Sequence, residues 1–148
     1  MNFTQECHVP VARERLWDLL MDVPAVSRCV PGVDAVEQAG DHAYTGSLAV
    51  KVGPVRLKLQ GTITIEEQDR AAWRARMRAE ANDRRVGGGI RALMQLALLP
   101  EGDGTRIRIE TELAILGKIG EFGQPIIRSK ADRLLEDFAR NLSTALAS

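Results

Sequence analysis

The stretch Val50-Lys-Val-Gly-Pro-Val-Arg-Leu-Lys-Leu-Gln-Gly61 decides the fold, because it holds two alternating strands joined by a sharp turn. Apolar and polar side chains alternate on both sides of Gly53-Pro54, and a period of two gives a sheet one dry face and one wet face. Glycine and proline at the centre supply the backbone freedom and the fixed φ of a tight reversal. The stretch therefore predicts an antiparallel hairpin with one buried face.

The same alternation continues along most of the chain, and helical spacing replaces it near the start and at the end. Apolar residues recur three or four apart from Ile119 to Ala145, which predicts one amphipathic helix of about seven turns. Short helices are predicted over residues 12–21 and 25–29, because Pro24 interrupts the helical pattern. Strands are predicted over residues 2–9, 33–39, 43–52, 55–66, 71–81, 89–99 and 105–115. This order predicts the α+β class, with one antiparallel sheet and a long C-terminal helix in a single domain over residues 1–148.

Composition narrows the classes of function. The 148 residues are 45% hydrophobic and 27% charged, which is typical of a globular domain. The formal net charge of zero argues against a general nucleic-acid partner. No signal peptide is visible at the N-terminus, and no apolar run is long enough to cross a bilayer. We therefore expect a cytoplasmic protein.

Residues that commonly carry chemistry are few and scattered. His8, His42, Cys7 and Cys29 fall on three predicted elements, so we expect neither a metal site nor another cofactor. His42 and Tyr44 share strand parity and are the best acid–base candidates. The favoured alternative is a solvent-exposed histidine and a tyrosine packed at the rim of the sheet. We therefore predict no catalytic residue.

Strand parity predicts which side chains face the final helix. They are apolar and come from successive strands, as expected for the wall of a site that binds an apolar molecule. Phe122 and Ile126 lie on the apolar stripe of the predicted final helix and join this set, with Tyr44 as a polar group at its rim. The strand residues predicted to bind a ligand are Leu48, Leu57, Leu59, Trp73, Met77, Ile90 and Met94.

Arginines dominate the opposite parity of one predicted strand. Arg74, Arg76 and Arg78 alternate with apolar residues, so their guanidinium groups share the wet face. One interpretation is a basic patch for an acidic partner protein or for anionic lipid head groups. The favoured alternative is cross-strand ion pairing on a solvated sheet, in which each pair contributes little stability.

Three glycines precede Pro125 at the start of the predicted final helix. Glycine costs a helix interior about 1 kcal/mol relative to alanine, and proline removes one helical hydrogen bond. We predict that the segment from Gly117 to Pro125 is a deformable gate over a cavity, with Phe122 as its apolar plug and with Lys118 and Arg128 nearby. An irregular helix start is the simpler alternative.

Several of these motifs together resemble the CoxG family of carbon monoxide dehydrogenase subunits, which belongs to the START-like, helix-grip superfamily. The resemblance implies a curved seven-stranded sheet that grips the C-terminal helix, with a hydrophobic cavity between them. It also implies an accessory role beside a molybdenum hydroxylase such as carbon monoxide dehydrogenase, and a link between that enzyme and the membrane. The motifs are Val9–Leu20, Val26–Gly32, Tyr44–Gly46, Val50–Pro54, Gly61 and Gly117–Gly123.

Two functions from different classes remain open at this point. The first is a non-catalytic carrier or accessory protein that holds a lipid or an isoprenoid quinone and docks on a partner enzyme, with a peripheral contact at the inner face of the membrane. The second is a polyketide cyclase-like enzyme that uses the same cavity. An enzyme needs convergent polar groups, and the predicted wall offers little beyond Tyr44. The carrier is therefore the favoured hypothesis.

Overall fold

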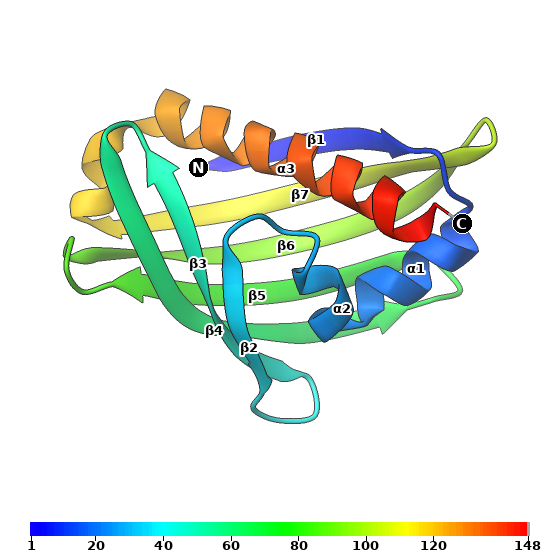
Figure 1. Ribbon diagram of the computed structural model, residues 1–148, viewed down its shortest axis with the longest axis horizontal. Helices are drawn as coiled ribbons and strands as arrows, with labels where there is room; N and C mark the ends of the chain where they lie inside the picture. The colour runs from blue at the N-terminus through cyan, green and yellow to red at the C-terminus, as the bar shows by residue number, and fades with distance from the viewer. Residues whose placement is uncertain (148) are drawn as a thin grey trace.

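The computed structural model of the protein describes residues 1–147. It contains one seven-stranded antiparallel sheet, and the long last helix crosses one side of it (Figure 1). The order of elements confirms the predicted α+β architecture. The elements are β1 (Asn2–Val9), α1 (Arg13–Met21), α2 (Val23–Ser27), β2 (Val33–Gln38), β3 (Ala43–Val52), β4 (Val55–Asp69), β5 (Arg74–Asp83), β6 (Gly88–Glu101), β7 (Gly104–Gly117), the 3₁₀ helix η1 (Lys118–Phe122) and α3 (Gln124–Leu146).

The strands lie in the order β1-β7-β6-β5-β4-β3-β2, and each neighbouring pair is antiparallel. Strands β2 and β3 curve around the side of the sheet that α3 crosses (Figure 1). Gln5 of β1 donates a hydrogen bond to Asp132 of α3, so its side chain identifies the face toward the helix. We call this side the inner face and the opposite side the outer face.

The Gly53-Pro54 turn lies where the alternating pattern places it. Val52 pairs with Val55 across a two-residue loop, and Gly53 has a φ of +58°. Two-residue hairpins favour a positive φ in the turn, which glycine adopts without steric cost. This turn sets the register of β3 on β4 and so directs Leu57 and Leu59 to the inner face.

The buried core consists of two separate clusters at opposite ends of the inner face. The α1 cluster joins α1, β1, β6, β7 and the C-terminal part of α3. The η1 cluster lies beneath η1, near the Gly53-Pro54 turn. The buried residues of the α1 cluster are Val9, Val11, Leu16, Trp17, Leu20, Cys29, Leu98, Ile107, Ile109 and Leu142, and those of the η1 cluster are Val52, Leu57, Leu59 and Ile119.

Two predicted boundaries are wrong for local reasons. The predicted strand over 71–81 begins only at Arg74, because Trp73 has a φ of +57° and belongs to the turn after β4. The second helix spans Val23–Ser27 rather than 25–29. The Asp22 carboxylate accepts a hydrogen bond from the Ala25 backbone N–H, which places the helix start earlier.

The predicted continuous final helix is also wrong at its start. The chain forms the short helix η1, and α3 begins only after Gly123, which has a φ of +82°. A residue with positive φ cannot continue a right-handed helix, so the two helices have different phases. The apolar stripe predicted from Ile119 through Ile126 is therefore broken at Gly123.

Candidate functional site: the inner face of the sheet

The register places six of the predicted ligand-binding residues on the inner face. Leu48 pairs with Leu59, and Met77 pairs with Met94. Tyr44 shares this face, because it pairs with Ile63 two positions along β4 from Gly61. The six residues are Leu48, Leu57, Leu59, Met77, Ile90 and Met94. Their role in binding a ligand stays a prediction.

These residues differ in burial, and the difference locates the candidate site. Leu57 and Leu59 are buried in the η1 cluster beneath η1. Large side chains between the two clusters are only half-buried, although they face the same side as the core. The inner face is thus closed at both ends and incompletely covered in the middle. The half-buried side chains are Tyr44, Leu48, Ile63, Ile65, Met77, Ile90 and Met94.

Small residues form the floor of this middle region. Gly46 of β3 pairs with Gly61 of β4, which pairs with Ala81 of β5. A Cβ atom on Gly61 would lie 2.6 Å from the Ala81 Cα atom, so this contact between strands requires glycine. Ala79 and Ala92 pair on the adjacent row. The floor therefore adds little side-chain bulk between the flanking leucines and methionines.

One transverse row of side chains crosses the sheet from β4 to β1. The row runs through cross-strand pairs and ends at Phe3, which the Arg128 guanidinium of α3 covers at 4.8 Å from the ring centroid. Arg128 also forms an ion pair with Asp132 at 3.0 Å, and it donates a hydrogen bond to the backbone carbonyl of Thr4. The N-terminal half of α3 therefore closes the β1 end of the row. Its members are Ile65, Met77, Met94, Thr111 and Phe3.

Most buried polar side chains of the inner face have structural hydrogen bonds. The Gln5 amide donates to Asp132 at 2.8 Å, and this bond contributes most to lowering the pKa of the Asp132 carboxyl. The Thr105 hydroxyl donates to the carbonyl of Val11 at 2.7 Å. Thr111 differs, because its buried Oγ1 atom has no hydrogen-bond partner among residues 1–147.

Asp83 is a buried carboxylate at the η1 end of the sheet, with an exposed fraction of 4%. It accepts backbone N–H hydrogen bonds from Lys58 at 2.8 Å and from Arg85 at 2.9 Å. The bond from Lys58 contributes most to lowering the pKa of Asp83. Because these bonds fix β4 and the turn after β5, Asp83 has a structural role.

Trp73 does not lie with the other predicted ligand-binding residues. Its ring meets Trp17 of α1 edge-to-face, with centroids 5.9 Å apart and an interplanar angle of 89°. The guanidinium groups of Arg13 and Arg70 lie 4.3 and 5.2 Å from the Trp73 ring centroid. Trp73 therefore packs against the α1 cluster and not among the half-buried residues of the middle region.

The predicted residues of the final helix separate at Gly123. Phe122 of η1 is half-buried and packs on the η1 cluster, whereas Ile126 of α3 is 48% exposed. The prediction that Ile126 faces the sheet is wrong, because α3 starts with a new phase after Gly123. Ile119, with an exposed fraction of 4%, is the side chain that η1 inserts into the core.

The acid–base candidates and the cysteines are not brought together into a reactive site. His42 is exposed in the loop before β3, and Tyr44 is half-buried. Burial raises the pKa of the Cys7 thiol to about 11, so this side chain stays protonated near neutral pH. Residues 1–147 hold no cluster of three or more histidine, cysteine or acidic residues suited to a metal ion.

The arginines of the outer face form ion pairs. Arg76 and Arg78 of β5 lie 3.4 and 3.1 Å from the Glu66 carboxylate of β4. Arg106 of β7 forms a 3.0 Å ion pair with Glu6 of β1. These contacts agree with the cross-strand alternative expected for the arginine ladder. A groove of about 500 Å³ on this side is lined by residues that include Arg74, Arg76, Leu99, Arg108 and Glu110.

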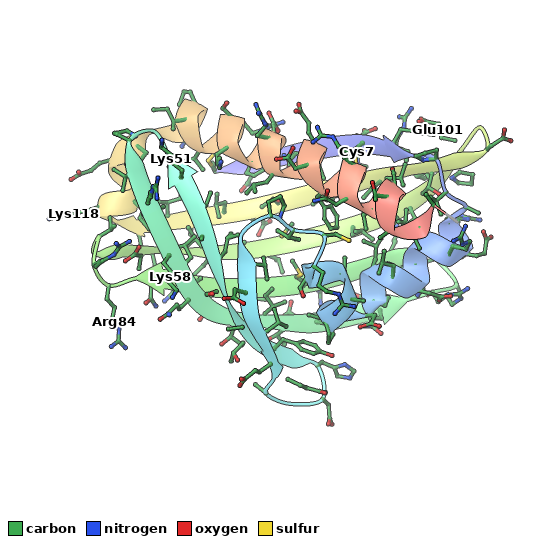
Figure 2. The ribbon with its side chains drawn as sticks, viewed as in Figure 1. Cys7, Lys51, Lys58, Arg84, Glu101 and Lys118 are labelled. Atoms are coloured by element: carbon green, nitrogen blue, oxygen red, sulfur yellow. The ribbon has the colours of Figure 1, made fainter. Side chains whose placement is uncertain are left out.

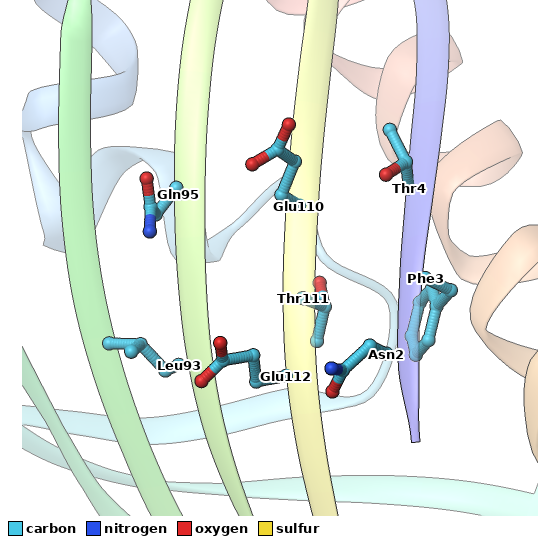
Figure 3. Close-up of a pocket in the computed structure, with 8 residues that line it drawn as sticks. All are labelled: Asn2, Phe3, Thr4, Leu93, Gln95, Glu110, Thr111 and Glu112. Carbon is cyan, nitrogen blue, oxygen red and sulfur yellow. The ribbon is translucent and has the colours of Figure 1, made fainter.

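A second surface pocket, of about 290 Å³, lies along β1, β7 and β6 (Figure 3). By strand alternation most of its lining residues belong to the outer face. Thr111 and Phe3 also contribute to the lining, but the Thr111 Oγ1 atom is itself shielded from solvent. The full lining is Asn2, Phe3, Thr4, Leu93, Gln95, Glu110, Thr111 and Glu112.

Basic side chains surround the end of the molecule that carries the η1 cluster. Lys51, Arg84 and Lys118 all lie at this end, where η1 meets the β3–β4 and β5–β6 turns (Figure 2). All three are exposed. Among residues 1–147 no helix combines the length and the apolar character that a transmembrane segment requires.

Sequence reasoning missed three inner-face residues, namely Ile63, Ile65 and Thr111. The two isoleucines could have been found, because they continue the alternation of Leu57 and Leu59 along the same strand. Thr111 could also have been noticed as the one polar residue in an apolar alternation from Ile107 to Ile115. Its lack of a hydrogen-bond partner is visible only in the structure.

Comparisons with solved structures identify the fold. A conserved protein from Geobacillus kaustophilus superposes with a TM-score of 0.89 at 20% identity, covering 99% of this chain and 95% of that chain. The Zhui aromatase/cyclase from Streptomyces sp. R1128 gives a TM-score of 0.67 at 13% identity, with coverage of 98% and 92%. Norcoclaurine synthase from Thalictrum flavum gives 0.65 at 14% identity, with coverage of 100% and 94%. The fold is therefore START-like, of the helix-grip type.

Sequence comparison gives one family. The model of the CoxG family, whose members are described as a type of carbon monoxide dehydrogenase subunit, matches residues 6–147. No protein of curated function matches the chain in sequence.

Proposed function

Because the chain belongs to the CoxG family of carbon monoxide dehydrogenase subunits, we propose that it is a non-catalytic accessory protein that carries an apolar molecule on its inner face. The half-buried apolar residues between the α1 and η1 clusters carry this proposal. Large apolar side chains on the face toward the final helix are normally covered by protein, and an exposed apolar region of this kind is typical of a binding surface.

The wall chemistry favours a long apolar ligand. Covering apolar surface gains about 25 cal/mol per Å² removed from water, and this gain needs no precise polar contact. Met77 and Met94 lie side by side, and flexible thioethers adapt to ligands of varied shape. A lipid or an isoprenoid quinone fits this chemistry. The proposed lining is Leu48, Leu57, Leu59, Met77, Ile90, Met94 and Phe122, with Tyr44 at the rim.

The family supports a partner as well as a ligand. Its description names carbon monoxide dehydrogenase, so we propose a molybdenum hydroxylase of this kind as the docking partner. The exposed basic residues Lys51, Arg84 and Lys118 support a peripheral contact with anionic lipid head groups at the η1 end. In this proposal the protein works in the cytoplasm, loading or unloading its ligand at the membrane face, and it needs no resident cofactor.

A cyclase-like enzyme is the alternative, because an aromatase/cyclase shares the fold. The inner face argues against it. Gln5, Thr105 and Asp83 are engaged in hydrogen bonds that hold the fold, so they are poorly placed to act as acids or bases. Tyr44 and Thr111 alone do not supply a convergent acid–base pair. Turnover of a polyketide substrate that is lost in Tyr44→Phe would establish the enzyme instead.

Methyl NMR tests the carrier proposal directly. Protein labelled with ¹³C at the methionine methyl groups is titrated with decylubiquinone and, separately, with oleate. We expect the Met77 and Met94 resonances to shift, whereas Met21, which packs against the α1 cluster, stays unchanged. Failure of both probes to move Met77 or Met94 would contradict the proposal.

A matched pair of variants locates the site. Ala79→Leu adds bulk to the floor of the inner face, and Ala97→Leu adds the same bulk to the outer face of β6. We expect Ala79→Leu to weaken binding of the NMR-active probe at least about tenfold, because the leucine fills the space that the ligand needs. Ala97→Leu should bind like the parent. Equal binding by both variants would place the ligand elsewhere.

A further inference from the structure

The hydroxyl of Thr111 is the exception among the buried polar groups of the described chain. Four buried polar or charged residues are present in residues 1–147, namely Gln5, Asp83, Thr105 and Thr111. The first three have side-chain hydrogen bonds, whereas Thr111 is 6% exposed and its Oγ1 atom has none. Native proteins rarely leave a buried hydroxyl unpaired, and such groups are frequent at sites that bind something else.

The surroundings of Thr111 offer it no protein partner. Across the sheet it pairs with Met94 on β6 and with Phe3 on β1 (Figure 3). Along β7 its neighbours on the same face are Ile109 and Leu113. All four of these side chains are apolar, so the hydroxyl lies in a region where a hydrogen bond is worth more than in water.

Thr111 is also continuous with the proposed binding face. It follows Met77 and Met94 on the same transverse row. Met94 is half-buried and has a flexible side chain, so a ligand that displaces its thioether reaches the Thr111 hydroxyl. A molecule lying across the two methionines therefore has one end beside Thr111.

The charges near the row exclude an anionic head group at this point. Arg128, the closest cation identified at the β1 end, is already paired with Asp132 and covers the Phe3 ring. A carboxylate or phosphate placed beside Thr111 would lack a free counter-ion in apolar surroundings, which is strongly unfavourable. A neutral oxygen, such as the carbonyl of a ketone, quinone or ester, needs only one donor.

We propose that Thr111 donates a hydrogen bond to a neutral carbonyl oxygen of the apolar ligand, so that the protein selects carbonyl compounds over pure hydrocarbons and free fatty acids. This inference rests on the proposed carrier function and adds the chemical class of the ligand. A threonine hydroxyl supplies one rotatable donor, which suits a carbonyl acceptor.

The test compares 9-fluorenone with fluorene, which differ by a carbonyl in place of a methylene group. Binding is measured from the Met94 methyl resonance in the parent, in Thr111→Val and in Thr111→Ser. We expect Thr111→Val to weaken fluorenone binding roughly fivefold to tenfold, as the loss of one hydrogen bond predicts. Thr111→Ser should stay near the parent, and fluorene should bind all three proteins alike.

Infrared spectroscopy adds a readout that packing alone does not change. The carbonyl stretch of bound fluorenone should lie at lower frequency in the parent and in Thr111→Ser than in Thr111→Val. Without ligand, Thr111→Val should unfold at the same temperature as the parent or higher, because it removes an unpaired buried hydroxyl of nearly the same volume.

The outcomes separate the two proposals. Equal fluorenone affinity in the parent and Thr111→Val, with no change in the carbonyl stretch, would overturn the role of Thr111 while the Met94 shifts still support a carrier. A lower unfolding temperature for Thr111→Val would show that the hydroxyl has a structural role and would also overturn the inference. If no probe, including those used for the carrier test, shifts Met94 in the parent, both proposals fall.

Discussion

The Gln5 side chain donates a 2.8 Å hydrogen bond to the Asp132 carboxylate, which joins the first strand to the last helix across 127 residues of sequence. Gln5 is buried, and Asp132 also forms an ion pair with Arg128 on the next turn of α3. The pair therefore determines where the N-terminal half of the helix lies above β1 and, through Arg128, above Phe3.

Loss of this bond should loosen that half of α3. We expect Asp132→Ala to lower the free energy of unfolding by about 1 kcal/mol, because Gln5 is left buried without its acceptor. Asp137→Ala is a matched control, since it removes only an ion pair with Arg140 on the same helix, worth less than about 0.5 kcal/mol. Urea denaturation measures both, and equal losses would show that the Gln5 bond contributes nothing special.

Asp83 should make stability depend on acid pH. Its pKa in the folded protein is lowered from 3.8, mainly by the Lys58 N–H bond. A lowered pKa in the folded state means that the contribution to stability is complete above about pH 4 and is lost as the pH falls through the folded pKa. Asp83→Asn should therefore unfold at a lower temperature than the parent at pH 7, and the difference should shrink at pH 2.5. A difference that stays constant between these pH values would contradict this role.

The three glycines of the predicted gate should respond differently to alanine. Gly120 has only the Ile115 side chain near its missing Cβ and no positive φ, so Gly120→Ala should stabilise the protein by up to about 1 kcal/mol and slow ligand exchange. Gly123 has a φ of +82°, and Gly123→Ala should destabilise by about 1 to 2 kcal/mol. The double alanine variant is therefore not expected to raise stability. Thermal unfolding and NMR exchange rates test this, and unchanged exchange in Gly120→Ala would remove the support for a gate.

Ile119 should matter far more than Ile126, although both lie near the start of the final helical region. Ile119→Ala removes a side chain that is 4% exposed in the η1 cluster, and should cost about 2 to 5 kcal/mol. Ile126→Ala removes one that is 48% exposed and should change stability by less than about 0.5 kcal/mol. Similar losses for both variants would indicate that Ile126 is covered in solution.

Alternation along the strands was sufficient to predict the sheet and the face on which Leu48, Leu59, Met77 and Met94 lie, because one buried face fixes the parity of each strand. The same rule failed at Trp73, since its positive φ ends the alternation in a turn that the side-chain pattern does not reveal. This residue reports on α1 through Trp17, so its fluorescence is a weak probe of the middle region.

Helical spacing had the same weakness at Gly123. The apolar positions 119, 122 and 126 fit one helix by spacing, but the backbone at Gly123 changes the phase and turns Ile126 outward. The phase depends on a single φ angle that glycine leaves undetermined by sequence. The unpaired hydroxyl of Thr111 could not be predicted either, because it depends on which neighbours three separate strands bring beside it.

The pairing of β1 with β7 also orders the events of synthesis. Asn2 to Val9 leave the ribosome first, yet their only strand partner is the segment from Thr105 to Glu112. Until that segment emerges, the apolar residues of β1 have no ladder to join, and α1 lacks most of the surface on which it packs. The nascent chain therefore carries its N-terminal strand unpaired through most of translation, and the sheet reaches its final width only when nearly the whole protein has been made.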